Sequence, residues 1–327
     1  MNIARDEDDG QRTLAVVIVS YNRLEQLKMG IEAVLNEPVC GVVVVDNGST
    51  DGSREWLATS EDARLRVLTP ERNLGGAGGF EVGFQEALSA FSPDWIVCFD
   101  DDARPQPGAL GRFLERDLEG ADSAAGAVYY PDGRICEMNR PSWNPFWHPI
   151  KLLKTMFGIL TGKARQGFHL PDAAYEANSA TSIDSSSFVG CFVSREWIEK
   201  IGLPRGDLFI YGDDIIYTLM LSRQGAKHFF LPDITFTHDC STFSSQKVTY
   251  SPLWKAYYTY RNGLLIYRLA AGPWFPFVVI TKTLMWVSAT LRYSDKKSYL
   301  TLCGVAVRDG VLGKTGRTHD EITQRFY

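Results

Sequence analysis

The sequence predicts an α/β fold, a doubly wound and mostly parallel β-sheet followed by a helical C-terminal region. One observation is that short apolar runs alternate with helix-like segments through about the first hundred residues. A second is that runs such as LAVVIVS and GVVVV are apolar throughout, as in central parallel strands that helices cover on both faces. A third is that polar residues follow three of these runs, where sheets of this type bind their ligands.

Composition describes a folded protein that is not a general nucleic-acid binder. The 327 residues are 45% hydrophobic and 22% charged, and the net charge is −5, whereas nucleic-acid binders show a basic excess. The polar, acidic segment 1–12 is expected to be a disordered tail. It is not predicted to be a signal peptide, because it lacks an apolar core flanked by positive charge. Six scattered cysteines form no CxxC pair, which favours reduced thiols in a cytoplasmic protein and argues against zinc.

In the first half, each predicted strand is an apolar run, and the segments between the runs are read as helices. The helix after the first strand ends before Pro38, and Asp51 is placed to cap the next helix. The predicted strands are 14–20, 41–45, 64–68 and 95–99. The predicted helices are 24–36, 51–60 and 80–91. This strand–helix succession predicts an open, mostly parallel sheet.

The second half is less regular. The segment 130–180 is rich in Trp, Pro, Phe and basic residues, and we expect an insertion that covers the functional site. Strands are then predicted at 185–193 and 228–231, and helices at 195–201, 213–224, 252–270, 273–292 and 296–311. The predicted division is a sheet domain at 13–250 and a helical region at 251–327.

Three adjacent aspartates, Asp100, Asp101 and Asp102, follow the apolar run 95–99. Adjacent carboxylates repel one another, and a buried strand supplies little water to reduce that repulsion. A divalent cation resolves the conflict, because Mg²⁺ and Mn²⁺ prefer hard oxygen ligands. Taken alone, the triplet is explained equally well by a solvated acidic turn.

Two further motifs lie between a predicted strand and a helix. Asp46 ends the second strand, where it can accept hydrogen bonds from a base or a ribose, or belong to a plain Asx turn. The glycine-rich segment 72–80 is predicted to be a loop before a helix, where a ligand can approach the backbone and an anion can meet free N–H groups. Its spacing matches neither the P-loop nor the dinucleotide fingerprint, so a loop without a ligand is the alternative.

Asp213 and Asp214 begin a predicted helix, whose macrodipole would keep a carboxylate ionised, as a general base requires. Helix capping alone explains one of these two aspartates. His238 follows an apolar segment. It is either an ordinary core or surface residue, or a third ligand for a metal held by Asp100 and Asp102.

In their order along the chain, these motifs resemble those of the family 2 glycosyltransferases with the GT-A fold. The matching segments are VVIVSYNR, VVVVDNGSTDGS, RNLGGAGGF, FDDDA, GDD, His238 and YYTYRNGLL, within about residues 13–270. The GGAGGF and DDDA segments are most similar to the rhamnosyl- and galactofuranosyltransferases that build bacterial surface polysaccharides.

The resemblance implies an inverting, Mn²⁺- or Mg²⁺-dependent transfer of galactofuranose or rhamnose from a UDP- or dTDP-linked donor to a glycan or polyprenyl-linked acceptor. It implies that the donor is bound by Ser20, Tyr21, Arg23, Asp46, Arg72, Asn73, Gly76, Gly78, Asp100 and Asp101. The implied metal ligands are Asp100, Asp102 and His238. Asp214 matches the general base, and Asp213 stands where the family usually has Glu.

Aromatic and basic residues interleave in the C-terminal helices, which suits the headgroup level of a membrane, a packed helical layer or a homodimer interface. The apolar stretch 273–289 is shorter than the ~20 residues that span a bilayer, so we predict an interfacial or buried helix.

Two rival functions are a sugar nucleotidyltransferase and a non-catalytic carbohydrate-binding protein on the same fold. The first needs a basic, glycine-rich triphosphate loop near the N-terminus, which segment 20–23 does not supply. Intact Asp100, Asp102, Asp214 and His238 argue against the second.

Overall fold

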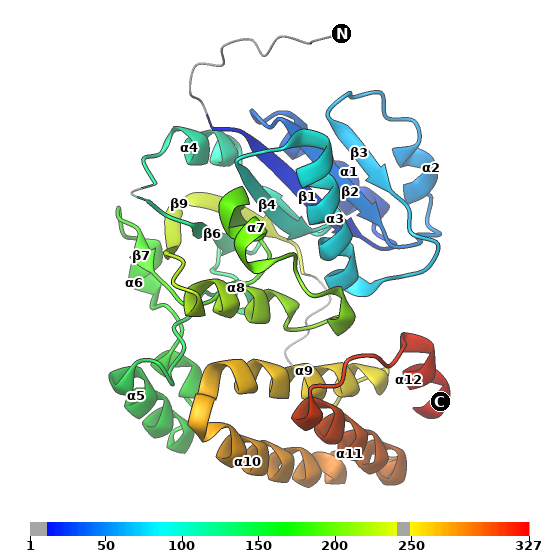
Figure 1. The fold of residues 1–327 in the computed structure, drawn as a ribbon, viewed down its shortest axis with the longest axis vertical. Helices are drawn as coiled ribbons and strands as arrows, with labels where there is room; N and C mark the ends of the chain where they lie inside the picture. Colours follow the sequence, from blue (N-terminus) through cyan, green and yellow to red (C-terminus); the bar gives the residue numbers. More distant parts are fainter. Residues whose placement is uncertain (1–11, 119, 241–248, 327) are drawn as a thin grey trace.

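The computed structural model describes residues 12–118, 120–240 and 249–326. Its centre is a nine-stranded sheet in the order β3-β2-β1-β4-β8-β6-β9-β5, with β7 pairing β9 (Figure 1). This architecture confirms the predicted α/β fold with a C-terminal helical region. The predicted tail lies outside the described residues except for Arg12, whose guanidinium donates to the carbonyl of Leu114 at 2.7 Å.

Four parallel strands form one half of the sheet. They are β1 (Leu14–Ser20), β2 (Gly41–Asp46), β3 (Leu65–Leu68) and β4 (Trp95–Asp100). The other half mixes directions, because β8 runs antiparallel to β4 and β6, and β9 pairs parallel with β6 but antiparallel with β5 and β7. Its strands are β5 (Ala103–Pro105), β6 (Ser123–Tyr129), β7 (Thr181–Ser182), β8 (Cys191–Ser194) and β9 (His228–His238).

Helices cover both faces of the sheet, as a doubly wound fold requires. Val16 and Ile18 of β1 pack into the core under the first helical layer, whereas Val17 and Val19 pack into the core under the second. The first layer contains α1 (Leu24–Leu35), α2 (Ser53–Leu57) and α4 (Ala109–Glu115). The second contains α3 (Gly75–Phe91), α7 (Arg195–Ile201) and α8 (Asp213–Arg223).

The glycine-rich segment corrects one prediction, because it forms the first turns of α3 and is not a loop before the helix. Glycine lowers helix stability, but here close packing against the sheet requires it. A Cβ on Gly79 would lie 2.5 Å from a methyl group of Val19, and a Cβ on Gly83 would lie 2.4 Å from Val17. The missing side chains let α3 approach β1.

Several other boundaries differ from the prediction. The strand predicted at 185–193 forms over Cys191–Ser194, the helix predicted at 51–60 shrinks to Ser53–Leu57, and the strand predicted at 228–231 continues to His238. Strands β5 and β6 and helix α4 were not predicted. The sequence of β6, SAAGAVY, is poor in strand-forming residues, and pairing with two neighbours makes it a strand.

The segment predicted as an insertion contains short helices. They are η1 (Glu137–Asn139), α5 (Pro149–Leu160), η2 (Ala164–Gly167) and α6 (Asp172–Tyr175). Helix α5 lies at the end of the molecule away from the sheet (Figure 1). The amide of Asn144, just before α5, donates to the carbonyl of Ala270 in the C-terminal region at 3.0 Å.

The C-terminal region forms its own core around Tyr257, Trp286, Tyr299 and Leu302. The three predicted helices are present, and a fourth follows them. The elements are α9 (Trp254–Ala271), η4 (Gly272–Trp274), α10 (Phe275–Ser288), η5 (Ala289–Arg292), α11 (Lys296–Leu312) and α12 (His319–Phe326). By length and composition the helical run Trp254–Arg292 is apolar enough to cross a membrane, which is weak evidence by itself. The chain turns back between α9 and α10 (Figure 1).

Candidate active site

A cavity of about 740 Å³ lies beyond the carboxyl ends of β1 and β4 and reaches the C-terminal helices. Most of the site residues predicted from the sequence line it. They are Ser20, Tyr21, Arg23, Asn73, Gly76, Asp100, Asp101, Asp102, Asp213, Asp214 and His238. The sheet thus brings together residues from the strand ends, from the start of α8 and from the end of β9.

Three predicted donor ligands do not line the cavity. Asp46 is buried and accepts hydrogen bonds from the N–H of Ser49 at 2.9 Å and from Arg54 at 3.3 Å. Arg72 is exposed on the preceding loop. Gly78 is buried inside α3, where a Cβ would lie 2.7 Å from the side chain of Leu74. A contact between these residues and a nucleotide sugar stays a prediction.

Asn47 lines the cavity, although it was not among the ligands predicted from the sequence. Its side-chain amide donates to the carbonyl of Gly75 at 2.9 Å and accepts from the N–H of Leu74 at 3.3 Å. Asn47 therefore holds the start of α3 against the end of β2. Its place directly after a strand-ending aspartate was the available sequence signal.

Strand pairing positions the three aspartates. Asp100 ends β4, and the carboxylate of Asp101 accepts from the N–H of Tyr21 at 2.9 Å. Strand β5 pairs with β9, which sets Ala103 opposite His238. As a result Nε2 of His238 lies 3.0 Å from Oδ1 of Asp102, while the guanidinium of Arg23 contacts Oδ2.

Burial shifts the ionisation of this cluster. It raises the pKa of Asp100 to about 7, helped by the charge of Asp102, and the pKa of Asp101 to about 6. Burial also acts on Asp102, but the hydrogen bond and charge of His238 and the charge of Arg23 outweigh it and hold that pKa below its usual value. A divalent cation is one way to offset the negative charge gathered here.

The residues present fit a hard divalent cation. Asp100 and Asp102 offer carboxylate oxygens and line the cavity together with His238, whose Nε2 lies 3.0 Å from Oδ1 of Asp102. On the other side of the imidazole ring, Nδ1 lies 2.7 Å from Oδ1 of Asn139. Such a second contact fixes the orientation of a metal-ligating histidine. Two carboxylates and one imidazole suit Mn²⁺ or Mg²⁺.

Asp213 and Asp214 face the cavity from the first turn of α8. Oδ1 of Asp214 accepts from the N–H of Ile215 at 2.7 Å. Burial nevertheless raises the pKa of Asp214 to about 6, and burial together with the charge of Asp214 raises the pKa of Asp213 well above its usual value. Two adjacent carboxyl groups with raised pKa values are suited to proton transfer near neutral pH.

The loop before α8 is held by α9. Phe209 and Tyr211 have positive φ angles, of 67° and 69°, which are unfavourable for these side chains. The buried side chain of Asn262 donates to the carbonyls of Ile210 and Tyr211, both at 2.8 Å, and Arg261 donates to the carbonyl of Leu208 at 2.7 Å. Arg261 and Asn262 are therefore positioning residues that were not predicted. The available sequence signal was a charged residue followed by an amide residue within a helix rich in aromatic side chains.

Residues 15–171 match the sequence model of the glycosyl transferase family 2. Galactofuranosyltransferase GlfT1 of Mycolicibacterium smegmatis is 27% identical, over 76% of this chain and 81% of the relative. The dTDP-rhamnosyl transferase RfbF of Shigella flexneri is 28% identical, over 92% of this chain and 96% of the relative. Polyprenol monophosphomannose synthase of Mycolicibacterium smegmatis is 31% identical, over 69% of this chain and 78% of the relative.

Solved structures agree on the fold. The crystal structure of GalNAc-T7 with UDP, GalNAc and Mn²⁺ matches with a TM-score of 0.59 at 12% identity, and covers 99% of this chain and 61% of that longer chain. At this identity the match establishes the fold alone. With the sequence matches, it shows that the chain belongs to glycosyl transferase family 2, has the GT-A fold and is related to galactofuranosyl- and rhamnosyltransferases.

Proposed function

We propose that this glycosyltransferase moves galactofuranose or rhamnose, with inversion, from a UDP- or dTDP-linked donor to a glycan or polyprenyl-linked acceptor in cell-surface polysaccharide synthesis. The observation that carries the proposal is the meeting of two carboxylate pairs in one cavity. Asp100 and Asp102 line this cavity together with His238, and Asp213 and Asp214 line it as well. One pair of carboxylates that can hold a metal ion and another pair that can act as a general base, in the same cavity, suit displacement at a sugar carbon.

In this mechanism Asp214 takes the proton of the acceptor hydroxyl as that oxygen attacks the sugar, and general-base catalysis of this kind contributes about 10²–10⁴-fold. Asp100, Asp102 and His238 would hold Mn²⁺ or Mg²⁺, which, when bound, stabilises charge on the diphosphate leaving group. Arg23 holds the carboxylate of Asp102 toward the cavity. Tyr21 exposes half of its surface at the mouth, where a base can stack on it.

The names of the relatives support the choice of donor. GlfT1 is named a galactofuranosyltransferase and RfbF a dTDP-rhamnosyl transferase, and RfbF matches this chain over most of its length. A panel of UDP-galactofuranose, dTDP-rhamnose, UDP-galactopyranose and GDP-mannose, each with Mn²⁺, tests the proposal through metal-dependent donor hydrolysis and thermal stabilisation. We expect one of the first two donors to give both signals. Failure of every donor to bind with Mn²⁺ would overturn the proposal.

We further propose that helices α5 and α10 seat the protein on an anionic membrane surface, where a polyprenyl-linked acceptor would lie. Both helices carry large apolar side chains that the rest of the chain leaves exposed. Phe157 and Leu160 of α5 are 69% and 83% exposed, and Phe277 and Leu284 of α10 are 63% and 65% exposed. Exposed apolar surface on this scale marks an interaction site.

The charge around these helices supports an anionic bilayer as the partner. Neither 146–171 nor 240–294 contains Asp or Glu, although the whole protein has a net charge of −5. Lys151, Lys154 and Lys163 lie in or next to α5, and Lys282 and Arg292 lie in or next to α10. Basic residues beside apolar ones suit a helix lying in the headgroup layer, where each contributes about 1 kcal/mol.

Co-sedimentation with phosphatidylglycerol or phosphatidylcholine vesicles tests this surface. We expect binding to the anionic vesicles that weakens as salt is raised, and loss of binding in Phe157→Glu/Phe277→Glu. Met29→Glu, which alters an exposed apolar residue on α1, is the matched control and should bind like the wild type. A stable dimer in solution that Phe157→Glu/Phe277→Glu dissociates would instead assign the surface to a second copy of the chain.

A further inference from the structure

We propose that Cys136, Cys240 and His238 form a second metal site, selective for a soft ion such as Zn²⁺, and that filling this site inhibits the enzyme. The inhibitory part rests on the proposed function, because it needs His238 to serve the hard-cation site. The binding part does not.

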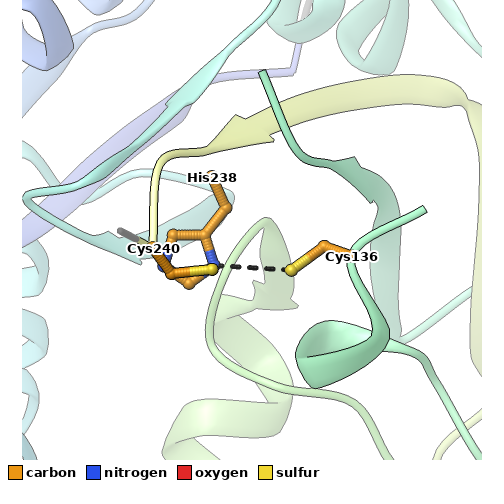
Figure 2. Close-up of side chains that lie close together, drawn as sticks. All are labelled: Cys136, His238 and Cys240. Carbon is orange, nitrogen blue, oxygen red and sulfur yellow. Dashed lines mark hydrogen bonds between the residues drawn. The ribbon is translucent and has the colours of Figure 1, made fainter. Parts of the chain in front are cut away.

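The three side chains come from separate parts of the chain. Cys136 lies directly before η1, whereas His238 ends β9 and Cys240 follows two residues later. Their ligand atoms all lie within 4.8 Å of one another, and Nδ1 of His238 lies 3.9 Å from Sγ of Cys136 (Figure 2). Tetrahedral zinc needs its sulfur and nitrogen ligands about 3.5–3.8 Å apart, so small side-chain movements would complete the site.

Two thiols select for a soft metal. Thiolate and imidazole ligands suit Zn²⁺, whereas Mg²⁺ and Mn²⁺ prefer oxygen. Cys136 and His238 are buried, while Cys240 is half-buried and lines the cavity, which gives an ion a route from solvent. On binding, both thiols release their protons to solvent, and a water molecule from the cavity takes the fourth position.

The spacing of the cysteines along the sequence, without a CxxC pair, argued against zinc. Folding changes that conclusion, because β9 brings Cys240 next to a cysteine more than a hundred positions earlier. Asn139, the last residue of η1, adds to the contact, since its Oδ1 lies 3.0 Å from Sγ of Cys136.

One imidazole ring serves both metal sites. Nε2 faces Asp102, and Nδ1 faces Cys136 and Asn139. A neutral imidazole has a single nitrogen lone pair for a metal. When Nε2 binds the hard cation, Nδ1–H donates to Asn139. When Nδ1 binds the soft ion, Nε2–H donates to Asp102 instead. The two metal ions therefore require opposite tautomers of His238 and cannot both bind its ring. Binding of the soft ion removes one ligand from the hard-cation site.

Binding is tested on the full chain, which is first reduced and freed of metal. Saturating Mn²⁺ is then added before Zn²⁺. Equilibrium dialysis should give one tight Zn²⁺ per chain in the wild type. Co²⁺ in its place should show the intense thiolate-to-cobalt charge-transfer absorption of a sulfur-ligated tetrahedral ion. Cys240→Ser and Cys136→Ser should weaken Zn²⁺ binding roughly 100-fold and remove that absorption.

Cys40→Ser is the matched control, since Cys40 is another half-buried free thiol outside the cluster. It should bind Zn²⁺ like the wild type. Cys240 is half-buried, so its serine variant should fold even if the buried Cys136→Ser does not. Unchanged Zn²⁺ affinity in folded Cys240→Ser, or a cobalt complex without thiolate absorption, would overturn the proposed site.

Inhibition is tested by measuring transfer at fixed Mn²⁺ while Zn²⁺ is raised. Measured relative to its own activity without Zn²⁺, Cys240→Ser should require roughly 100-fold more Zn²⁺ for half inhibition than the wild type, in line with its weaker binding. Equal inhibition of wild type and Cys240→Ser would place the inhibitory ion on the carboxylates and refute the competition for His238. If no donor supports transfer, the proposed function fails, but the dialysis and cobalt results still decide whether the site exists.

Discussion

Nε2 of His238 lies 3.0 Å from Oδ1 of Asp102, although 136 residues separate the two in the sequence. The pairing of β5 with β9 produces this contact, because it sets Ala103, the residue after Asp102, opposite His238. The other ring nitrogen is held by Asn139 at 2.7 Å. A histidine anchored in this way presents one nitrogen to the carboxylates in a fixed orientation.

Adding Mn²⁺ to metal-free protein should raise its stability even without donor. The cation relieves repulsion within the aspartate cluster, and a ligand at 100 times its Kd contributes about 2.7 kcal/mol. Differential scanning calorimetry measures the shift in Tm, and a chelator should reverse it and abolish transfer. Asp102→Asn should lose most of the shift, whereas Glu61→Gln, on an exposed loop, should keep it. A full shift in Asp102→Asn would contradict the metal assignment.

Asp214→Asn should fold and bind donor with Mn²⁺ but lose transfer. The amide cannot accept the acceptor proton, so kcat should fall by about 10²–10⁴-fold. Isothermal titration calorimetry checks donor affinity, and single-turnover assays check the chemical step. Asp213→Asn is the informative comparison, because its carboxyl group lies beside that of Asp214. Near wild-type turnover in Asp214→Asn would show that the base is another residue.

Activity should decline on the acid side of neutrality. Burial raises the pKa of Asp214 to about 6, and a base acts only when it is deprotonated. With saturating Mn²⁺, kcat/KM should change little above pH 7 and fall about tenfold per pH unit below about pH 6. A profile of kcat/KM between pH 5 and pH 8 measures this. A profile that stays flat to pH 5 would rule out a base with this raised pKa.

Asn262→Ala should loosen the loop that leads into α8. It leaves the carbonyls of Ile210 and Tyr211 without their donor, which should reduce the free energy of unfolding by about 2 kcal/mol. Displacement of Asp214 should also lower kcat by roughly 10- to 100-fold. Thr259→Ala removes a hydrogen bond within α9 itself and is the matched control. Urea unfolding and steady-state kinetics provide the two measurements, and an unchanged kcat would limit Asn262 to stability.

A buried histidine should make the fold sensitive to acid. His228 lies between Ser123 at 2.5 Å and Ser186 at 3.2 Å, and burial lowers its pKa to about 3. Because the folded pKa is below the unfolded value, its stabilisation is complete above about pH 6.5 and is lost as the pH falls toward 3. By pH 5.5 the loss should be about 1.4 kcal/mol.

His228→Asn removes the titrating group, so its free energy of unfolding should fall less between pH 7.5 and pH 5.5 than that of the wild type. Thr301→Ala, which changes an exposed residue without an ionisable side chain, should keep the pH dependence of the wild type. Urea unfolding at both pH values compares the three proteins. A wild type and a His228→Asn variant with the same dependence on pH would contradict the role of His228.

The strands of the first half and the cavity at their ends follow from local patterns. Apolar runs such as LAVVIVS are stable as strands only when both faces of the strand are buried. Parallel strands place their carboxyl ends at the same edge of the sheet. Ser20, Asp100 and Asp102 were therefore predicted to lie together. The glycines of α3 misled the prediction, because their local cost to a helix is offset by close packing against β1, which no local pattern reveals.

By itself, the sequence determined the α/β class, the presence of a C-terminal helical region and the family of enzymes to which the chain belongs. Tertiary structure alone decided that Asp102 meets His238, that Cys240 meets Cys136, and that Asn262 holds the loop before α8. Hydrophobic periodicity and the alternation of strands and helices along the chain reflect interactions within a few residues. Each short segment contains these interactions by itself. Contacts across a hundred residues depend on which strands pair and in what register, and these are set when the whole chain packs.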